Sequence, residues 1–483
     1  MKELIDQIQI LESISQELEP KEAVRKEYYG KILDYANHFI STIHSTHGYC
    51  NSEPTPGTLT INGSKKTIEE IIQLYANEVT PHGVNAASGG HVGYIPGGGI
   101  FTAALGDFIA DITNKFAGMY YAAPGAVTIE NEVINWLKTI FRFPNNAVGN
   151  LTSGGSIANL IALTSARDHH QIKGDKIKRS VIYLSAQVHH CIHKAIRIIG
   201  LEDIIIREVD LEEHYRIDSL KLNKQIIKDK ENGLNPFCII ASAGTTDTGA
   251  VDPLEEIGKI AQENRLWYHI DAAYGGFFIL TESKKHFFKG IESADSLVID
   301  PHKGLFLPYG TGAVLIKNKK AVFHSHQYTA KYMQDAIHDD INLSPADLSP
   351  ELTKHFRGLR MWLPLQIHGI KPFIACLEEK LLLTKYFRNK LIEIGFKIGP
   401  EPDLSVSYFW YPSAHTDENT FNKKLMELIH KDGRVFLSST NIDGKFVIRM
   451  AILSFRTKIK TIDKAIEMIK EVKDQLENMY KFE

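Results

Sequence analysis

The chain has 483 residues, with 55 Lys and Arg against 58 Asp and Glu, and a net charge of −3. Hydrophobic residues make up 43% and charged residues 23% of it, which excludes long disordered or collagen-like structure. The near-zero charge gives no electrostatic footprint for nucleic acid or an anionic membrane surface, and the length predicts about three units of roughly 150 residues.

Two further features bear on location. No apolar run reaches about 18 residues, and the N-terminus lacks the apolar core of a secretion signal. The cysteines lie far apart without a CxxC pair, which argues against a disulfide framework or a Cys-rich zinc site and suits a reducing compartment. We therefore expect a cytoplasmic protein that does not span a membrane.

The first segment is predicted to be helical. Leu4, Ile8, Leu11 and Ile14 recur at helical spacing, and a second apolar stripe follows over 24–43. Neither helix could bury its stripe alone, so both should pack on another domain or another subunit. An irregular stretch over 51–99 follows, interrupted by a short helix near 68–77.

The middle of the chain, 101–317, alternates helical stretches with short apolar runs. This pattern indicates a largely parallel sheet covered on both faces, in which ligands collect at the carboxyl ends of the strands. The predicted strands are 180–186, 204–209, 237–243, 266–273, 296–300 and 312–316.

The pattern of predicted helices and strands changes after about residue 370. Hairpin strands beside helices predict a smaller α+β domain there. The chain thus divides into an N-terminal helical arm (1–90), a large domain (91–370) and a small C-terminal domain (371–483).

Several polar residues follow the predicted strands. TSGGS (152–156) opens a helix and offers free N–H groups for a phosphate, although an ordinary glycine turn with Ser156 as the N-cap is the alternative. In VHHCIHKA (188–195), His189 and His193 could share a helix face as metal ligands. No third ligand is evident, so a single functional His189 without metal is the simpler interpretation.

Asp271 and Lys303 carry the strongest chemical signal. Asp271 ends an apolar strand, where a carboxylate needs a cation or a protonated ring nitrogen as its partner. Lys303 follows another strand, where a lysine in a dry site can act as an amine nucleophile. Each could alone be an ordinary turn residue. With His189 as a stacking residue and the helix start at TSGGS, they match the requirements of pyridoxal phosphate.

These residues resemble the group II pyridoxal-phosphate-dependent decarboxylases, which include aromatic-L-amino-acid and glutamate decarboxylases. The resemblance covers about 91–456. It rests on TSGGS, HIDAAYGG (269–276), GTTDTGAVD (244–252), SLVIDPHKGL (296–305), HFRGLRMW (355–362) and FVIRMAI (446–452). It implies an α/β fold of the fold type I class, with a mostly parallel central sheet, and a homodimer with the site at its interface.

The resemblance also implies roles for single residues. Lys303 would form the Schiff base with the cofactor, and Asp271 would pair with the pyridine nitrogen. His189 would stack on one face of the ring. The other implied cofactor contacts are Ala273 on the opposite face, Thr246 beside the cofactor, and Gly155, Ser156 and His302 at the phosphate.

Three positions depart from the family pattern. Asp300 stands where aromatic decarboxylases tend to have Asn, and a carboxylate there would repel phosphate. Gly304 replaces a bulky residue and is expected to widen the site. Thr311 stands where Cys or Ala is usual.

The polar, weakly periodic stretch 323–340 is predicted to be a mobile active-site loop. Within it, Tyr332 matches the family tyrosine that protonates Cα after carbon dioxide leaves, with Tyr328 as its rival. In relatives that make aldehydes by oxidative deamination, Phe replaces this tyrosine. The tyrosine therefore favours decarboxylation of an L-amino acid to its amine.

The substrate is less determined. Aromatic residues expected near the cofactor suit an aromatic amino acid: Tyr94, Phe101, Tyr120 and Tyr121. An acidic substrate (glutamate, aspartate or cysteine sulfinate) would need a cationic clamp such as Arg449 or Arg357. An aldehyde synthase or lyase on the same cofactor is a further alternative, and a scaffold without activity is disfavoured by the intact site residues.

Overall fold

A computed structural model describes residues 1–327 and 343–482. Within them, a seven-stranded sheet has the order β3-β9-β8-β7-β6-β4-β5, and only β9 runs antiparallel to its neighbours. The mostly parallel sheet predicted from the apolar runs is confirmed. Its strands are β3 (Val148–Thr152), β4 (Ser180–Leu184), β5 (Ile205–Glu208), β6 (Asn235–Ser242), β7 (Trp267–Asp271), β8 (Ser296–Ile299) and β9 (Gly312–Ile316).

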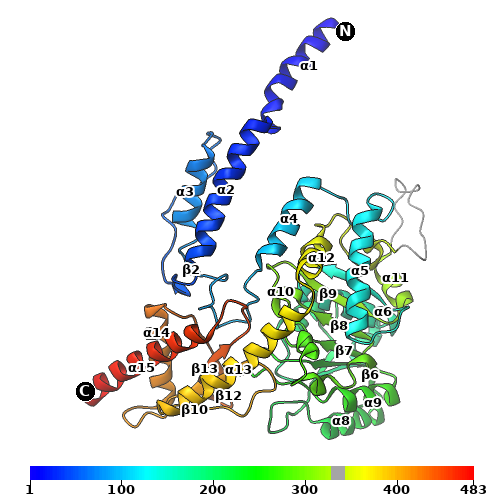
Figure 1. The fold of residues 1–483 in the computed structure, drawn as a ribbon. Coiled ribbons are helices and arrows are strands. Elements are labelled where there is room, and N and C mark those ends of the chain that lie inside the picture. The colour runs from blue at the N-terminus through cyan, green and yellow to red at the C-terminus, as the bar shows by residue number, and fades with distance from the viewer. Residues whose placement is uncertain (328–342, 483) are drawn as a thin grey trace.

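Helices cover both faces of this sheet (Figure 1). Successive strand residues point to opposite faces, so Tyr183 joins one apolar core and Ile182 the other. The first core includes α5 (Pro124–Ile140), α8 (Ser219–Glu231), α9 (Leu254–Asn264) and α12 (Arg357–His368). The second includes α6 (Gly155–His169), α7 (Cys191–Ile198) and α11 (Lys319–His326).

The C-terminal region forms its own antiparallel sheet of order β10-β11-β13-β12, packed against three helices. The hairpin and helix pattern predicted for this region is therefore present. Its elements are α13 (Lys371–Glu393), β10 (Lys397–Ile398), β11 (Val406–Trp410), α14 (Glu418–Asp432), β12 (Ser438–Ile442), β13 (Lys445–Ala451) and α15 (Ile459–Phe482).

The N-terminal helices project away from the rest of the chain (Figure 1). Neither α1 (Lys2–Ser15) nor α2 (Glu22–Thr42) has a buried residue, and Leu11 is 64% exposed. The stripe of α1 is thus left uncovered by this chain, whereas the stripe predicted over 24–43 is only partly exposed and ends at the buried Ile43. The region continues through β1 (Tyr49–Cys50), α3 (Ile68–Glu78), β2 (Gly83–Val84) and α4 (Phe101–Thr113).

One predicted loop is partly helical. Residues 323–326 belong to α11, whose Ala321 and Val322 are buried against the sheet, so the loop predicted over 323–340 starts too early. Tyr328 and Tyr332 lie outside the described residues. Among the helices that the structure describes, none has the length and apolar character needed to cross a membrane.

Candidate active site

A cavity of about 390 Å³ opens at the carboxyl ends of β6, β7 and β8. This is the position expected for ligands in a parallel sheet, because the loops after the strands diverge there. The structure brings together in its wall all of the residues assigned to the cofactor from the sequence: Lys303, Asp271, His189, Ala273, Thr246, Gly155, Ser156 and His302.

The start of α6 forms one end of the cavity. Gly154 is its N-cap and supplies no side-chain cap, so the first N–H groups of the helix remain available to a ligand. Ser156 is the second helical residue, not the N-cap of the alternative interpretation. A Cβ on Gly155 would lie 3.0 Å from Oδ2 of Asp300, so glycine keeps this end open.

Asp271 is buried and both of its carboxylate oxygens are engaged. The backbone N–H of Ala273 donates to Oδ1 (3.0 Å), and the side-chain amide of Asn159 donates to Oδ2 (3.2 Å). Each oxygen keeps further acceptor capacity, because a carboxylate oxygen has two lone pairs. The Asp271 carboxylate is therefore oriented before any ligand arrives.

A chain of hydrogen bonds behind Asn159 has only one consistent direction. As a carboxylate, Asp271 can only accept, so Asn159 donates through Nδ2 and its Oδ1 accepts from Nε2 of His269 (2.7 Å). At the other end the Trp267 indole can only donate to Ser296 Oγ (2.8 Å), whose hydroxyl then donates to Nδ1 of His269 (2.8 Å). Burial lowers the pKa of His269 to about 4, which fits the neutral ring that this direction requires.

Asp300 also lines the cavity, beside the start of α6 and near Lys303 and His302. Its Oδ2 is 3.0 Å from Nζ of Lys303 and 3.6 Å from Nε2 of His302, whereas its buried Oδ1 has no hydrogen-bond partner among the described residues. Burial opposes the charged form of Lys303, but the Asp300 and Asp271 carboxylates outweigh it and raise its pKa. The lysine is thus held protonated by its neighbours in this state.

His189 also lines the cavity, just after the strand β4. Its Nδ1 accepts from the Cys191 N–H (3.3 Å), and burial lowers the pKa of the ring, so Nε2 carries the proton of a neutral imidazole. Because α7 begins only at Cys191, His189 and His193 do not form an i, i+4 pair on one helix. No group of three His, Cys, Asp or Glu side chains within 1–327 and 343–482 is placed to hold a metal ion.

Some residues of the site were not identified from the sequence. Asn159 and Gln187 line the cavity, and Oε1 of Gln187 is buried without a partner among the described residues. The loop that contains Gly97 packs closely against the backbone at His302 and Lys303. Only glycine fits there, since a Cβ on Gly97 would lie 2.1 Å from the His302 carbonyl oxygen. The sequence did contain a signal for the hydrogen bonds behind Asp271. His269 and Asp271 are two residues apart on one strand, so their side chains lie on the same face of the sheet.

Several expected pocket residues lie elsewhere. Tyr94 (59% exposed), Phe101 (47%) and Tyr121 (68%) face solvent in this chain and do not line the cavity, nor does Tyr120. Gly304 does not widen the site either. A Cβ there would lie 2.8 Å from Cβ of Phe277, so the space beside it is filled by that buried ring.

The two candidate cationic clamps are engaged by other groups. Arg449 is buried and donates to the carbonyls of Thr246 (3.0 Å) and Gly93 (2.9 Å). Arg357 forms a 3.5 Å ion pair with Glu351, and neither arginine lines the cavity. The described cavity therefore offers an acidic substrate side chain no free arginine.

Comparison with known proteins identifies the family. Residues 55–412 match the pyridoxal-dependent decarboxylase conserved domain. The chain is 35% identical over 395 residues to the aromatic-L-amino-acid decarboxylase of Bacillus atrophaeus, covering 80% of this chain and 82% of that protein. It is 26% identical over 420 residues to tryptophan decarboxylase 2 of Oryza sativa subsp. japonica, covering 84% of each.

The fold agrees with solved structures. Oryza sativa TDC, crystallised with PLP and tryptamine, superposes with a TM-score of 0.88 at 22% identity, covering 95% of this chain and 99% of that one. The chain belongs to the pyridoxal-dependent decarboxylase family and has the fold type I architecture. It is a carboxy-lyase that acts on an amino acid with pyridoxal phosphate, as the sequence predicted.

Proposed function

Since the chain is a pyridoxal-dependent decarboxylase, we propose that it converts an aromatic L-amino acid to the corresponding amine and carbon dioxide. The observation that carries this proposal is the cavity in which Lys303, Asp271 and the start of α6 converge without a free arginine. The curated relative at 35% identity, an aromatic-L-amino-acid decarboxylase, supports the same substrate class.

The cavity suits the cofactor in its chemistry. It combines an amine, a buried carboxylate and an uncapped helix N-terminus. Two buried polar oxygens at its wall lack partners among the residues that the structure describes: Asp300 Oδ1 and Gln187 Oε1. In our proposal Lys303 binds the cofactor covalently and Asp271 accepts a hydrogen bond from its ring nitrogen. The cofactor would also contact His189, Ala273, Thr246, Gly155, Ser156 and His302.

Bound pyridoxal phosphate supplies an electron sink for the electrons left on Cα when carbon dioxide departs. The protein residues have separate tasks around it. The Asp271 carboxylate, already oriented by Asn159, keeps a proton on the ring nitrogen because a carboxylate favours a cation beside it. His189 presents a neutral ring and Ala273 a small one-carbon side chain to the cofactor. The amine of Lys303 must give up its proton to bind a carbonyl carbon.

We assign the return of a proton to Cα to Tyr332, with Tyr328 as the rival donor. A phenol is a suitable acid for a carbanion. Protonation of Cα gives the amine, which distinguishes simple decarboxylation from oxidative deamination to an aldehyde. Both tyrosines lie outside the described residues, so this assignment rests on the match to the family pattern.

We further propose that the protein acts as a homodimer in the cytoplasm, with 1–90 as the arm that clasps the partner, 91–370 as the cofactor domain and 371–483 as the small domain. The exposed apolar stripes of α1 and α2 and of Phe108 and Ile112 on α4 support this, because isolated helices rarely leave such stripes in water. Tyr94, Phe101 and Tyr121 would then face the second subunit. Sedimentation of the full chain and of a chain lacking 1–45 tests the arm: loss of the dimer is expected in the shorter chain.

A substrate panel tests the activity. The purified holoenzyme is incubated with Trp, Tyr, Phe, Glu, Asp and cysteine sulfinate, and carbon dioxide, amine, aldehyde and hydrogen peroxide are measured. Equimolar carbon dioxide and amine from an aromatic substrate are expected. Turnover of the acidic substrates alone would refute the substrate class. Aldehyde and peroxide, formed with consumption of dioxygen, would instead indicate an aldehyde synthase.

Matched tyrosine variants test the proton donor. Tyr332→Phe should lower amine formation by about a hundredfold or more, as expected for loss of a general acid. Tyr328→Phe should retain most of it. The reverse pattern would move the assignment to Tyr328.

A further inference from the structure

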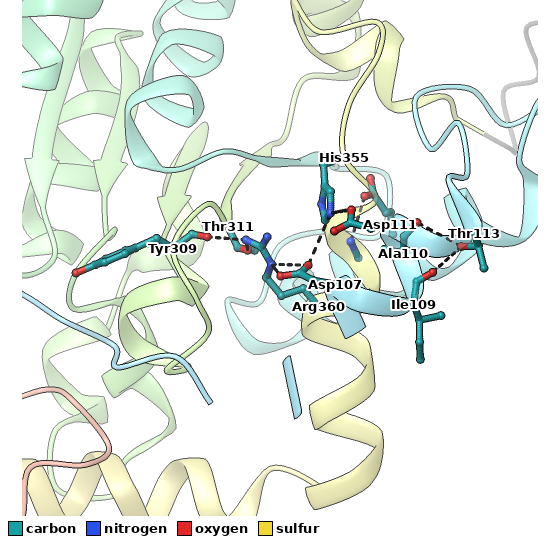
Figure 2. A network of polar contacts seen from close by, with 11 residues as sticks. Asp107, Ile109, Ala110, Asp111, Thr113, Tyr309, Thr311, His355 and Arg360 are labelled. Carbon is teal, nitrogen blue, oxygen red and sulfur yellow. Dashed lines mark hydrogen bonds and ion pairs between the residues drawn. The ribbon is translucent and has the colours of Figure 1, made fainter. Parts of the chain in front are cut away.

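A polar cluster connects α4 and α12 to the turn 309–311, which follows Lys303 in the sequence (Figure 2). Nε of Arg360 on α12 donates to both carboxylate oxygens of Asp107 on α4, at 2.8 and 2.7 Å. On its other side, an Arg360 terminal nitrogen donates to the Tyr309 carbonyl (2.7 Å) and to the Thr311 hydroxyl (3.0 Å). One guanidinium thus bridges a carboxylate and a turn.

The turn is shaped around this guanidinium. Gly310 has φ +96°, a backbone conformation that other residues rarely adopt, and a Cβ there would lie 3.0 Å from the same Arg360 nitrogen. Thr311 is fully buried, so its hydroxyl cannot exchange Arg360 for water. His355 joins the cluster from outside α4: its Nε2 lies 3.1 Å from Oδ1 of Asp111 and 3.8 Å from Oδ1 of Asp107, both on α4. The cluster therefore fixes the turn relative to both helices.

The same turn holds His302 at the cavity. The Thr311 carbonyl accepts from the backbone N–H of His302 (3.2 Å) and lies 2.7 Å from Nδ1 of its ring. A carbonyl can only accept, so Nδ1 carries a proton and Nε2 is the ring nitrogen left on the side of Asp300. The position of Thr311 thus decides both the orientation of the ring and which nitrogen it presents.

We propose that Arg360 and Thr311 are positioning residues for cofactor binding, because the Arg360–Thr311 hydrogen bond fixes the turn whose carbonyl orients His302 in the cavity wall. Neither residue lines the cavity, so both act through His302. The inference rests on the proposed function only in the assignment of His302 to the cofactor phosphate. It deepens that assignment by naming what holds the histidine in place.

Cofactor affinity in matched variants tests the inference. The apoenzyme is titrated with pyridoxal phosphate, and the dissociation constant is measured by equilibrium dialysis for wild type, Thr311→Val, Thr311→Ser and Arg360→Gln. Thr311→Val keeps the shape but loses the hydroxyl, and a lost hydrogen bond to a charged group should weaken binding by about tenfold. Thr311→Ser restores the hydroxyl and should bind within about twofold of wild type.

The double variant Arg360→Gln with Thr311→Val separates a shared path from two independent defects. If both residues act through the same bond, the double variant should bind the cofactor no more weakly than Arg360→Gln alone. Thr113→Val, on α4 but bonded only to the carbonyls of its own helix, is the control and should bind as wild type does. The circular dichroism of the bound cofactor should change in Thr311→Val and recover in Thr311→Ser.

Three results would overturn the inference: wild-type affinity in Thr311→Val, binding by Thr311→Ser as weak as by Thr311→Val, or full additivity in the double variant. Thermal unfolding of each apoenzyme distinguishes a folding defect from a loss of cofactor affinity. A folding defect would lower the unfolding temperature without altering the affinity of the folded fraction. If Thr311→Val does not fold, Arg360→Lys replaces it, because lysine keeps the charge opposite Asp107 but not the planar fork. Failure of the proposed function is distinguishable, because another substrate or product in the amino-acid panel would leave the expected order of cofactor affinities among these variants unchanged.

Discussion

Asp271 ends strand β7 and Asp300 follows the neighbouring strand β8; both are buried and line the same cavity, yet their surroundings differ. Both oxygens of Asp271 accept hydrogen bonds, and a directed chain through Asn159 and His269 stands behind one of them. Asp300 instead pairs with Lys303 through one oxygen and leaves the other without a partner among the described residues. The Asp271 carboxylate is thus oriented by hydrogen bonds before a ligand arrives, whereas Asp300 is held mainly by the charge of Lys303.

Loss of the lysine should have the largest effect on this arrangement. Lys303→Ala removes the amine that we propose binds the cofactor, and it leaves Asp300 without its cation. We expect no measurable decarboxylation and no visible absorbance from covalently held cofactor. Absorbance spectra and carbon dioxide release check this, with the exposed Lys460→Ala as the control. A visible band that survives in Lys303→Ala would place the covalent bond at another lysine.

Neutralising the preorganised carboxylate should have the next largest effect. Asp271→Asn keeps the size and the acceptor oxygen for Asn159 but removes the charge that we propose faces the ring nitrogen of the cofactor. Loss of one preorganised electrostatic partner typically lowers kcat by about 10²–10³-fold. Steady-state kinetics with the cofactor in excess check this. A kcat within a few fold of wild type would mean that the two carboxylates do not differ in function as their surroundings suggest.

Asp300→Asn should have a smaller effect and the opposite direction. Asp300 raises the pKa of Lys303, so the amide should lower that pKa and increase the fraction of free amine at pH 7. The amide also removes a charge that would repel a phosphate bound at the start of α6. We expect faster reconstitution of the apoenzyme with pyridoxal phosphate, followed by stopped-flow absorbance. Slower reconstitution would show that the carboxylate assists binding.

The hydrogen-bond chain behind Asp271 should affect mainly the pH dependence of stability. Burial lowers the pKa of His269 to about 4, below its usual value of about 6.5. The unfolded state therefore binds more protons between these values, and stability that is complete above about pH 6.5 is lost as the pH falls towards 4. His269→Gln should reduce the slope of the unfolding free energy in this window by up to about 1.4 kcal/mol per pH unit.

Urea unfolding of the apoenzyme at several pH values measures that slope. Trp267→Phe breaks the chain at its far end while leaving the histidine in place, and should keep the steep slope. An unchanged slope in His269→Gln would mean that the ring does not stay neutral in the folded protein.

Local pattern alone predicted much of this protein. Apolar runs between helical stretches marked the six strands from 180–186 to 312–316, because a strand buried on both faces must be continuously apolar. The residue types at the strand ends then indicated the cofactor, since few sites require a lysine, a buried carboxylate and an open helix start together. The family match confirms that reading.

Tertiary structure decided what depends on contacts between distant segments. Asn159 meets His269 across 110 positions of sequence, and Arg360 meets Thr311 across 49, spacings that no periodicity marks. Packing likewise left Tyr94 and Phe101 facing solvent and filled the space beside Gly304 with Phe277. The sequence by itself determined the amine, the buried carboxylate and the open helix start of the site, because these lie at strand and helix ends. Their orientation follows from side chains that only the folded chain brings into contact.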